Sequence, residues 1–111
     1  MKEDCIFCKI INNEIPSTKV YEDDTLIAFN DINPIAPVHI LVVPKVHVEN
    51  LMELEDNELL VHIVEVIKQI AKEQGIDKEG FRVVTNNGEN AGQEVKHLHF
   101  HILGGKKLGV N

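Results

Sequence analysis

The chain has 111 residues, of which 43% are hydrophobic and 26% charged, and its formal net charge at pH 7 is −7. This length suits one domain with one good core, and we expect residues 1–111 to form it. The longest apolar run, 40–43, is far too short to cross a membrane, and the N-terminus lacks the apolar segment of a signal peptide. The acidic balance disfavours binding to nucleic acid or anionic membranes, which needs a basic surface. We therefore expect a cytoplasmic protein.

Hydrophobic periodicity predicts a mixed α and β chain. Helical spacing of apolar residues indicates a short helix over 5–13, with Asp4 as the expected N-cap, and a long one over 56–74. The two prolines of 31–37 indicate a loop. Runs of β-branched and aromatic residues predict strands over 18–22, 25–30, 38–43 and 81–86, the first two as a hairpin around Asp23-Asp24.

The long helix 56–74 has more apolar surface than one small sheet can cover. Its polar residues form one narrow stripe that includes His62, to which we assign no function, and Gly75 supplies the expected stop. The apolar surface that needs a partner is centred on Leu60, Val64, Ile67 and Ala71. We therefore expect a homodimer joined through this helix and the strand 81–86.

The most informative stretch is 92–105, because three histidines lie two residues apart in it. His97, His99 and His101 alternate with Leu98, Phe100 and Ile102. This strict alternation predicts a half-buried strand with the imidazoles on one face and the apolar side chains in the core. A surface metal patch or a polar strand face is the simpler alternative. With the other elements, this strand indicates an α+β fold with an antiparallel sheet.

Histidines in this arrangement suit phosphoryl or nucleotidyl transfer. Imidazole exchanges its proton near neutral pH, and alternate residues of a strand lie roughly 7 Å apart. The middle histidine is best placed to attack phosphorus while a neighbour contacts the leaving atom. Backbone amides for phosphate oxygens are expected at Gly92-Gln93 and Gly104-Gly105. The chain has no G-x-x-x-x-G-K-[ST] loop, which disfavours a magnesium-dependent kinase or ATPase.

Three blocks of the chain resemble the histidine triad family, in its branch of purine nucleoside phosphoramidases. Segment 97–103, H-L-H-F-H-I-L, fits the motif of this family at every position, and the three blocks 4–16, 21–47 and 91–105 are similar to this branch. The Gly-Gly that follows the motif is closer to this branch than to the dinucleoside polyphosphate hydrolases. The resemblance implies the histidine triad fold, a five-stranded antiparallel sheet with one long helix and a short N-terminal helix.

The resemblance also implies roles for the histidines. It implies that His99 attacks the α-phosphorus of a purine nucleoside 5′-phosphoramidate and forms a nucleotidyl-histidine that water then cleaves. His101 would contact the bridging atom, and His97 and His39 would orient the triad.

The same resemblance implies a set of substrate-binding residues around the histidines. They are the purine slot (Ile6, Phe7, Ile10, Phe29, Ile32), the ribose carboxylate Asp31, and the phosphate-side residues Asn86 and Gln93. Plain core packing is the alternative for the five slot residues, and a turn-capping carboxylate is the alternative for Asp31.

Two features depart from the relatives. Glu94 stands where many of them have a small hydroxyl residue beside the leaving group, so that a carboxylate there either binds a basic amine or repels an acidic one. The chain also ends without the Trp-Pro-Pro of several phosphoramidases, which indicates looser selectivity.

Cys5 and Cys8 form a C-x-x-C pair, which in a reducing compartment indicates metal or redox chemistry. Some relatives with this pair look like zinc binders, and we predict a structural zinc held by Cys5, Cys8, His47 and His97, with no organic cofactor. A dithiol redox pair and two merely buried thiols are the alternatives.

Two other functions remain open from the sequence alone. One is a dinucleoside polyphosphate hydrolase or phosphorylase that uses the same strand. The other is a non-catalytic nucleotide-binding regulator.

Overall fold

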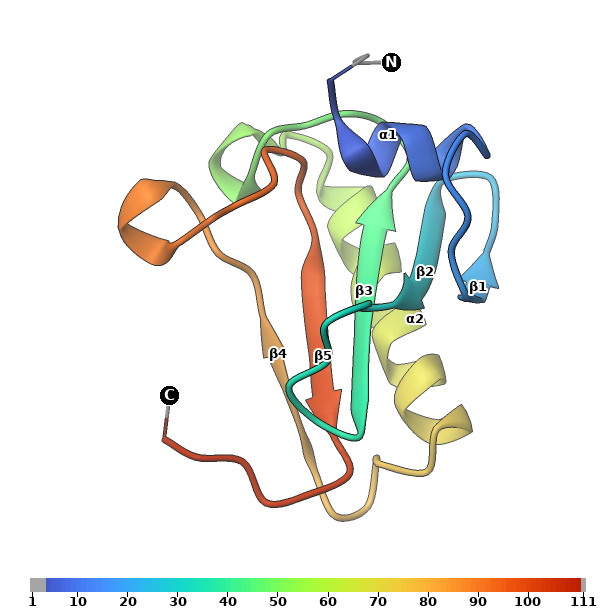
Figure 1. Ribbon diagram of the computed structural model, residues 1–111, viewed down its shortest axis with the longest axis vertical. Coiled ribbons are helices and arrows are strands. Elements are labelled where there is room, and N and C mark those ends of the chain that lie inside the picture. The colour runs from blue at the N-terminus through green and yellow to red at the C-terminus, as the bar shows by residue number, and fades with distance from the viewer. Residues whose placement is uncertain (1–3, 111) are drawn as a thin grey trace.

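A computed structural model describes residues 4–110 and contains one five-stranded sheet, two α-helices and two short 3₁₀ helices (Figure 1). The elements are α1 (Ile6–Ile11), β1 (Lys19–Glu22), β2 (Leu26–Asn30), β3 (Val38–Pro44), η1 (Leu51–Glu53), α2 (Asn57–Glu73), β4 (Phe81–Val84), η2 (Glu89–Ala91) and β5 (Phe100–Gly104). The strand order is β1-β2-β3-β5-β4, with every neighbouring pair antiparallel. The predicted α+β fold is therefore confirmed. The expectation about a signal peptide concerns the first three residues, which lie outside the described residues.

α2 lies against one face of the sheet, behind it in Figure 1. The alternate strand residues that form a core with this helix include Ile40, Val42, Leu98, Phe100 and Ile102. The prediction that the apolar residues of the histidine stretch point into the core is thus confirmed. No helix in the described part of the chain is long and apolar enough to cross a membrane.

α1 covers the upper part of the opposite face in Figure 1. Phe7, Cys8 and Ile10 of this helix pack with the other set of alternate strand residues, including Phe29 and Leu41. β3 is consequently buried on both faces, which explains its nearly continuous apolar sequence. Side chains of β3 and β5 that do not face α2, including those of His39 and His101, lie on the α1 face.

Several predicted boundaries are wrong by a few residues. Cys5, and not Asp4, is the N-cap of α1, because its Sγ accepts a hydrogen bond from the Cys8 amide at 3.3 Å. The histidine strand begins only at Phe100, since the Leu98 amide donates instead to the Val48 carbonyl at 2.7 Å. The strand expected over 81–86 ends at Val84.

The apolar face of α2 is less open than expected. Ile67 and Ala71, two of the four residues assigned to it, are only 5% and 1% exposed and belong to the core within the chain. The apolar side chains that α2 does leave exposed include Val61 and Val64, at 60% and 43%. The sheet thus covers more of this helix than its sequence suggests.

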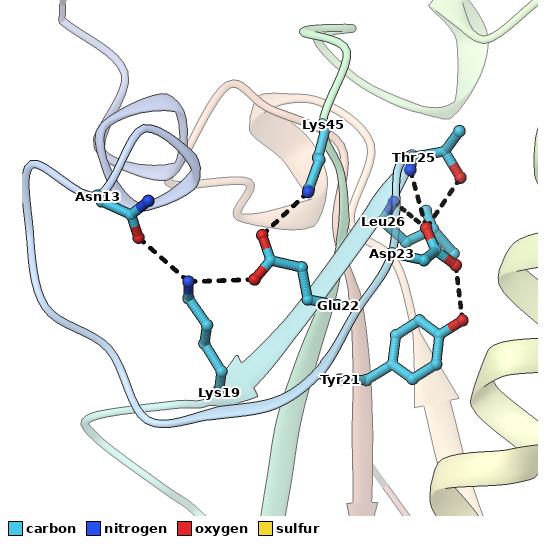
Figure 2. Close-up of polar contacts among 8 residues, drawn as sticks. All are labelled: Asn13, Lys19, Tyr21, Glu22, Asp23, Thr25, Leu26 and Lys45. Atoms are coloured by element: carbon cyan, nitrogen blue, oxygen red, sulfur yellow. Dashed lines mark hydrogen bonds and ion pairs between the residues drawn. The ribbon is translucent and has the colours of Figure 1, made fainter.

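The hairpin between β1 and β2 is fixed by one carboxylate, Asp23 (Figure 2). Asp23 Oδ1 accepts hydrogen bonds from the amides of Thr25 and Leu26, both at 2.8 Å, which is an Asx-type turn. Its Oδ2 accepts from the Tyr21 hydroxyl at 2.6 Å, and this bond raises the pKa of Tyr21 to about 12. His62 Nε2 lies 2.7 Å from the same oxygen, so this histidine of the helix contacts the hairpin. Although burial opposes it, these hydrogen bonds keep the pKa of Asp23 well below its usual range.

The Gly104-Gly105 pair has a packing role. A Cβ at Gly104 would lie 2.8 Å from Ile76 Cδ1, and one at Gly105, where φ is +90°, would lie 2.9 Å from the Pro37 Cβ. Neither glycine lines the cavity beside the histidines, so the expected phosphate contact of this pair is not supported. The C-terminal segment contacts β4, because Arg82 donates to the Gly109 carbonyl.

Candidate active site

One cavity of about 490 Å³ lies on the α1 face, with His99 and His101 in its wall. The predicted site residues that line it are Ile6, Phe7, Ile10, Phe29, Asp31, Ile32, Asn86, Glu94, His99 and His101. Apolar side chains of α1, β2 and the following loop thus share one space with the histidines of the β5 segment. A cavity with an apolar part and a few convergent polar groups is typical of a small-molecule site.

His99 is held by two hydrogen bonds that leave one ring nitrogen available. Its Nδ1 lies 2.7 Å from the His97 carbonyl oxygen, which can only accept, so Nδ1 carries the proton and Nε2 keeps its lone pair. Its own carbonyl accepts from the Thr85 hydroxyl at 2.8 Å. The Phe7 ring packs edge-on against the imidazole, with centroids 4.9 Å apart. Burial lowers the pKa of His99, which favours the neutral, nucleophilic ring.

His39 and His101 form a second hydrogen-bonded unit. The Ile35 amide donates to His39 Nδ1 at 3.2 Å, so the proton of a neutral His39 is on Nε2. This Nε2 lies 2.9 Å from His101 Nδ1 and 3.4 Å from Asp31 Oδ2. His101 Nδ1 therefore accepts, and His101 carries its proton on Nε2. One backbone amide in the loop before β3 thus determines the tautomer of a histidine on β5.

Desolvation keeps this pair neutral. Burial, together with the neighbouring histidines, lowers the pKa of His101 to about 4, and burial lowers the pKa of His39. At neutral pH the site therefore offers one imidazole with a free lone pair, at His99, and one with an N–H group, at His101. Their ring centroids are 5.1 Å apart.

A separate cluster joins α1 to the histidine segment. Cys5 Sγ lies 3.3 Å from His97 Nδ1, Cys8 Sγ lies 3.6 Å from the same nitrogen, and Cys8 Sγ lies 3.3 Å from His47 Nδ1. The four ligand atoms all lie within 4.8 Å of one another. Zn–S bonds of about 2.3 Å and Zn–N bonds of about 2.0 Å place tetrahedral ligands roughly 3.5 Å apart. These four residues therefore fit a zinc ion in composition and spacing.

His97 is prepared for this role by its second ring nitrogen. Nε2 donates to the Pro44 carbonyl at 2.8 Å, which leaves Nδ1 unprotonated and directed at the two sulfurs. A carbonyl partner on the far nitrogen is the usual support of a histidine ligand. Burial lowers the pKa of His97 to about 4 and keeps the ring neutral, as a ligand must be. Its contact with His99 goes through its backbone carbonyl, while its ring points to the cysteines.

Asp31, His39 and His101 also bring three potential ligand atoms together. A metal on His39 Nε2 would require the proton on Nδ1, but Nδ1 faces the N–H group of Ile35. Because two N–H groups would then face each other, this set does not fit a metal as well as the cysteine cluster does.

Gln93 is placed differently from the other predicted site residues. Its Oε1 accepts from the Gly88 amide, and its Nε2 donates to the carbonyls of Glu49 and Val95. The side-chain amide therefore ties together the loop before the histidine segment, and its phosphate contact remains a prediction. Sequence reasoning missed this role, as well as the contacts of Thr85 and of the Pro44 carbonyl. No local pattern signals the contacts of Gln93 with Glu49, of Thr85 with His99 or of Pro44 with His97, because each joins residues far apart in the sequence.

The fold and the site define a small α+β protein that presents neutral histidines to a cavity of about 490 Å³. Residues 12–108 match the family model described as HIT domain, and the chain belongs to this family, the histidine triad proteins. Across 97% of its length the chain is 52% identical to an uncharacterized HIT-like protein of Synechococcus elongatus, of which the match covers 96%. Across 98% of its length it is 43% identical to the purine nucleoside phosphoramidase of Escherichia coli K12, of which the match covers 93%.

Solved structures agree with this assignment. A histidine triad protein from Clostridium difficile is 60% identical and superposes with a TM-score of 0.95, over 100% of this chain and 98% of that one. A HIT family hydrolase from Clostridium thermocellum is 48% identical, with the same TM-score and coverage. These similarities confirm the predicted family and its fold.

Proposed function

We propose that the protein hydrolyses purine nucleoside 5′-phosphoramidates to the nucleoside monophosphate and an amine. The similarity to a HIT family hydrolase and to the Escherichia coli phosphoramidase supports a hydrolase in general. The observation that carries the specific proposal is the hydrogen bond from His99 Nδ1 to the His97 carbonyl, which leaves the Nε2 lone pair available beside the cavity.

In the first step His99 Nε2 attacks the α-phosphorus. A bond forms between this nitrogen and phosphorus, and the bond between phosphorus and the leaving nitrogen breaks. The leaving nitrogen needs a proton, and His101 can donate one because its tautomer carries the proton on Nε2. The Nε2–H group of His39 keeps donating to His101 Nδ1 across the 2.9 Å hydrogen bond and stabilises the negative charge that His101 gains when it gives up its proton. The His99 ring, with phosphorus on Nε2 and a proton on Nδ1, becomes positive, and the Asp31 carboxylate favours that charge.

In the second step water replaces the histidine. An oxygen–phosphorus bond forms, the bond from phosphorus to His99 breaks, and the nucleoside monophosphate leaves. The histidine pair takes up the proton that water gives up, so each residue returns to its starting state. Two displacements at one phosphorus, each easier than direct hydrolysis, are the advantage of covalent catalysis.

The cavity supports a purine nucleoside as the binding portion. Phe7, Ile10 and Phe29 provide apolar walls for a base, while Asp31 lines the same cavity as a carboxylate that suits the ribose hydroxyls. Among the described residues that line the cavity there is no Lys or Arg. A polyphosphate chain usually needs such cations, so the lining favours a substrate with one phosphate over a dinucleoside polyphosphate.

The test compares adenosine 5′-phosphoramidate with diadenosine tetraphosphate as substrates. We expect kcat/KM to be higher for the phosphoramidate, and mass spectrometry of the acid-quenched enzyme to find one adenylyl group attached at His99. Faster hydrolysis of the tetraphosphate would transfer the proposal to that substrate. Binding of nucleotides without turnover or adduct would favour a non-catalytic role.

We further propose that Cys5, Cys8, His47 and His97 hold a structural zinc. Two thiolates and two imidazoles give zinc a complete four-coordinate shell, so the ion stabilises the fold and leaves no open position for chemistry. A cytoplasmic location, where thiols stay reduced, is consistent with the two free cysteines. Metal analysis of protein purified without chelator should find about one zinc per chain.

A homodimer is the remaining part of the proposal. β4 is an edge strand, and its Val83 is 43% exposed on the α2 side of the sheet, since it pairs with Ile102 of the core. Val61 and Val64 add exposed apolar surface on α2 itself. Sedimentation should show a dimer at micromolar concentration, and a variant with Val83→Lys and Val64→Lys should be a monomer. A wild type that sediments near 12.5 kDa, the mass of one chain, would contradict this part.

A further inference from the structure

Two neighbouring cavities share three lining residues, namely Ile6, Glu94 and Val95. One is the cavity that contains the histidines. The other has a volume of about 480 Å³ and is further lined by Asp4, Cys5, His47, Glu49 and Lys96. If a nucleoside fills the apolar part of the first cavity, a leaving group must occupy the remaining space, and Glu94 stands where the two cavities meet.

The charges around this junction are mostly negative. The only ionised side chains among the described lining residues of the histidine cavity are Asp31 and Glu94. Asp31 is engaged, because its Oδ1 accepts from the Asn33 amide and its Oδ2 lies 3.4 Å from His39. Glu94 is exposed, and within residues 4–110 its carboxylate has no hydrogen bond or ion pair. It is therefore available to a ligand.

We propose that Glu94 selects leaving groups by charge, so that phosphoramidates whose amine carries a second, positively charged group are preferred to those whose amine carries a carboxylate. This inference rests on the proposed function and adds the chemical class of the leaving group. A cationic amine also gives a substrate whose own phosphate charge is balanced, which suits a cavity without Lys or Arg. An anionic amine places a further negative charge beside Glu94, at the junction of the two cavities.

The size of the preference follows from the exposure of Glu94. An interaction between unit charges near a protein surface is weakened by solvent, and exposed pairs have modest energies. We therefore expect Glu94 to contribute about threefold to tenfold in kcat/KM between amines of opposite charge. Because salt screens such pairs, the ratio of kcat/KM between the cationic and the anionic substrate should approach one in about 1 M salt.

The experiment uses three adenosine 5′-phosphoramidates that differ only at the end of the amine: N-propyl, N-(2-aminoethyl) and N-(2-carboxyethyl). For the wild-type protein at low ionic strength, kcat/KM should fall in the order cationic, neutral, anionic. Glu94→Gln should lower the ratio of the cationic to the anionic substrate by about threefold or more, and Glu94→Lys should reverse the order. The ratio is the readout, so a general change in activity does not affect the result.

Glu58→Gln is the matched control, since it removes the same charge from the exposed surface of α2, on the other face of the sheet. It should leave the ratio as in the wild type. A ratio near one in the wild type, or a ratio that Glu94→Gln and 1 M salt leave unchanged, would overturn the inference while the proposed function stands. Failure of the wild type to hydrolyse even the N-propyl compound would remove the proposed function, and this inference with it.

Discussion

The α1 face of the sheet carries two groups of histidines whose ring nitrogens are used in different ways. In the cysteine cluster, the Nε2–H group of His97 donates to the Pro44 carbonyl, and its Nδ1 is directed at the sulfurs of Cys5 and Cys8. Both ring nitrogens therefore have partners. At the cavity, the Nδ1–H group of His99 donates to the His97 carbonyl, and its Nε2 keeps a lone pair. In both histidines one ring nitrogen donates to a backbone carbonyl, so the difference lies at the other nitrogen, which faces two sulfurs in His97 and keeps an available lone pair in His99.

The two groups are joined through one residue. The ring of His97 belongs to the cysteine cluster, while its backbone carbonyl holds His99. Since the Pro44 carbonyl also anchors the His97 ring, the carbonyl of His97 should keep its place when a cysteine is lost. This arrangement predicts that substitutions in the cysteine cluster mainly affect stability, and that substitutions of the histidines at the cavity mainly affect catalysis.

The largest expected effect comes from loss of His99, whose Nε2 keeps its lone pair. His99→Ala should lower kcat by on the order of 10⁴-fold or more, since loss of a catalytic nucleophile has effects of this size. Nucleotide binding, measured by calorimetry with AMP, should persist because the slot and ribose contacts come from other residues. A variant that keeps more than a tenth of the wild-type rate would show that another group is the nucleophile.

The next largest effect tests the zinc site in the cysteine cluster. Cys5→Ser should remove most of the bound zinc and lower the free energy of unfolding by about 4 kcal/mol, in the range for loss of a structural metal. Activity at a temperature where the variant is folded should fall less than tenfold. Metal analysis, thermal melting and kcat are measured together, with Cys8→Ser as the matched variant. An unchanged melting temperature in a metal-free preparation would contradict the zinc site.

A smaller effect is expected from the support of the acid. His39→Gln removes the ring that holds His101 in one tautomer and should lower kcat by about 10- to 100-fold, as for other supports of functional histidines. The KM should change little, because His39 is not among the residues that line the cavity. A normal kcat, or a loss seen only in KM, would contradict the support of His101 by the hydrogen bond from His39.

The smallest effect concerns pH and stability. The pKa of His101 is about 4 in the folded protein, and a histidine of the unfolded chain has a pKa near 6.5. Above pH 6.5 the ring is neutral in both states and the folded protein keeps its full stability. As the pH falls from 6.5 to 4 only the unfolded chain takes up this proton, so the free energy of unfolding decreases. The contribution of one such group is at most about 1.4 kcal/mol per pH unit.

Urea titrations at pH 7, 6 and 5 measure this decrease, and His101→Gln should reduce the slope. The comparison with His99→Gln is informative, because burial also lowers the pKa of His99 and both variants should flatten the curve. A wild type whose stability does not change between pH 7 and 5 would show that these rings are not held neutral.

The sequence by itself determined the elements and the chemistry that the site has available. Alternation at 97–102 placed Leu98, Phe100 and Ile102 in the core, because side chains on a strand point to opposite faces in turn. The same alternation predicted the three histidines on the opposite side. The helical spacing of apolar residues over 5–13 placed the C-x-x-C pair at the start of a helix. The order of the three sequence blocks was enough to predict the family and its fold.

Only the tertiary structure decided how these groups are used. Strand pairing brings His39 within 2.9 Å of His101, although the two lie 62 positions apart in the sequence. The same holds for the Pro44 carbonyl, which selects the tautomer of His97 from 53 positions away, and for the Glu49 carbonyl, which binds the Gln93 side chain from 44 positions away. Burial of Ile67 and Ala71 was likewise decided by how far the sheet extends beneath α2. Periodicity reports the direction of a side chain relative to its own backbone, whereas its hydrogen-bond partners depend on which distant segment packs against it.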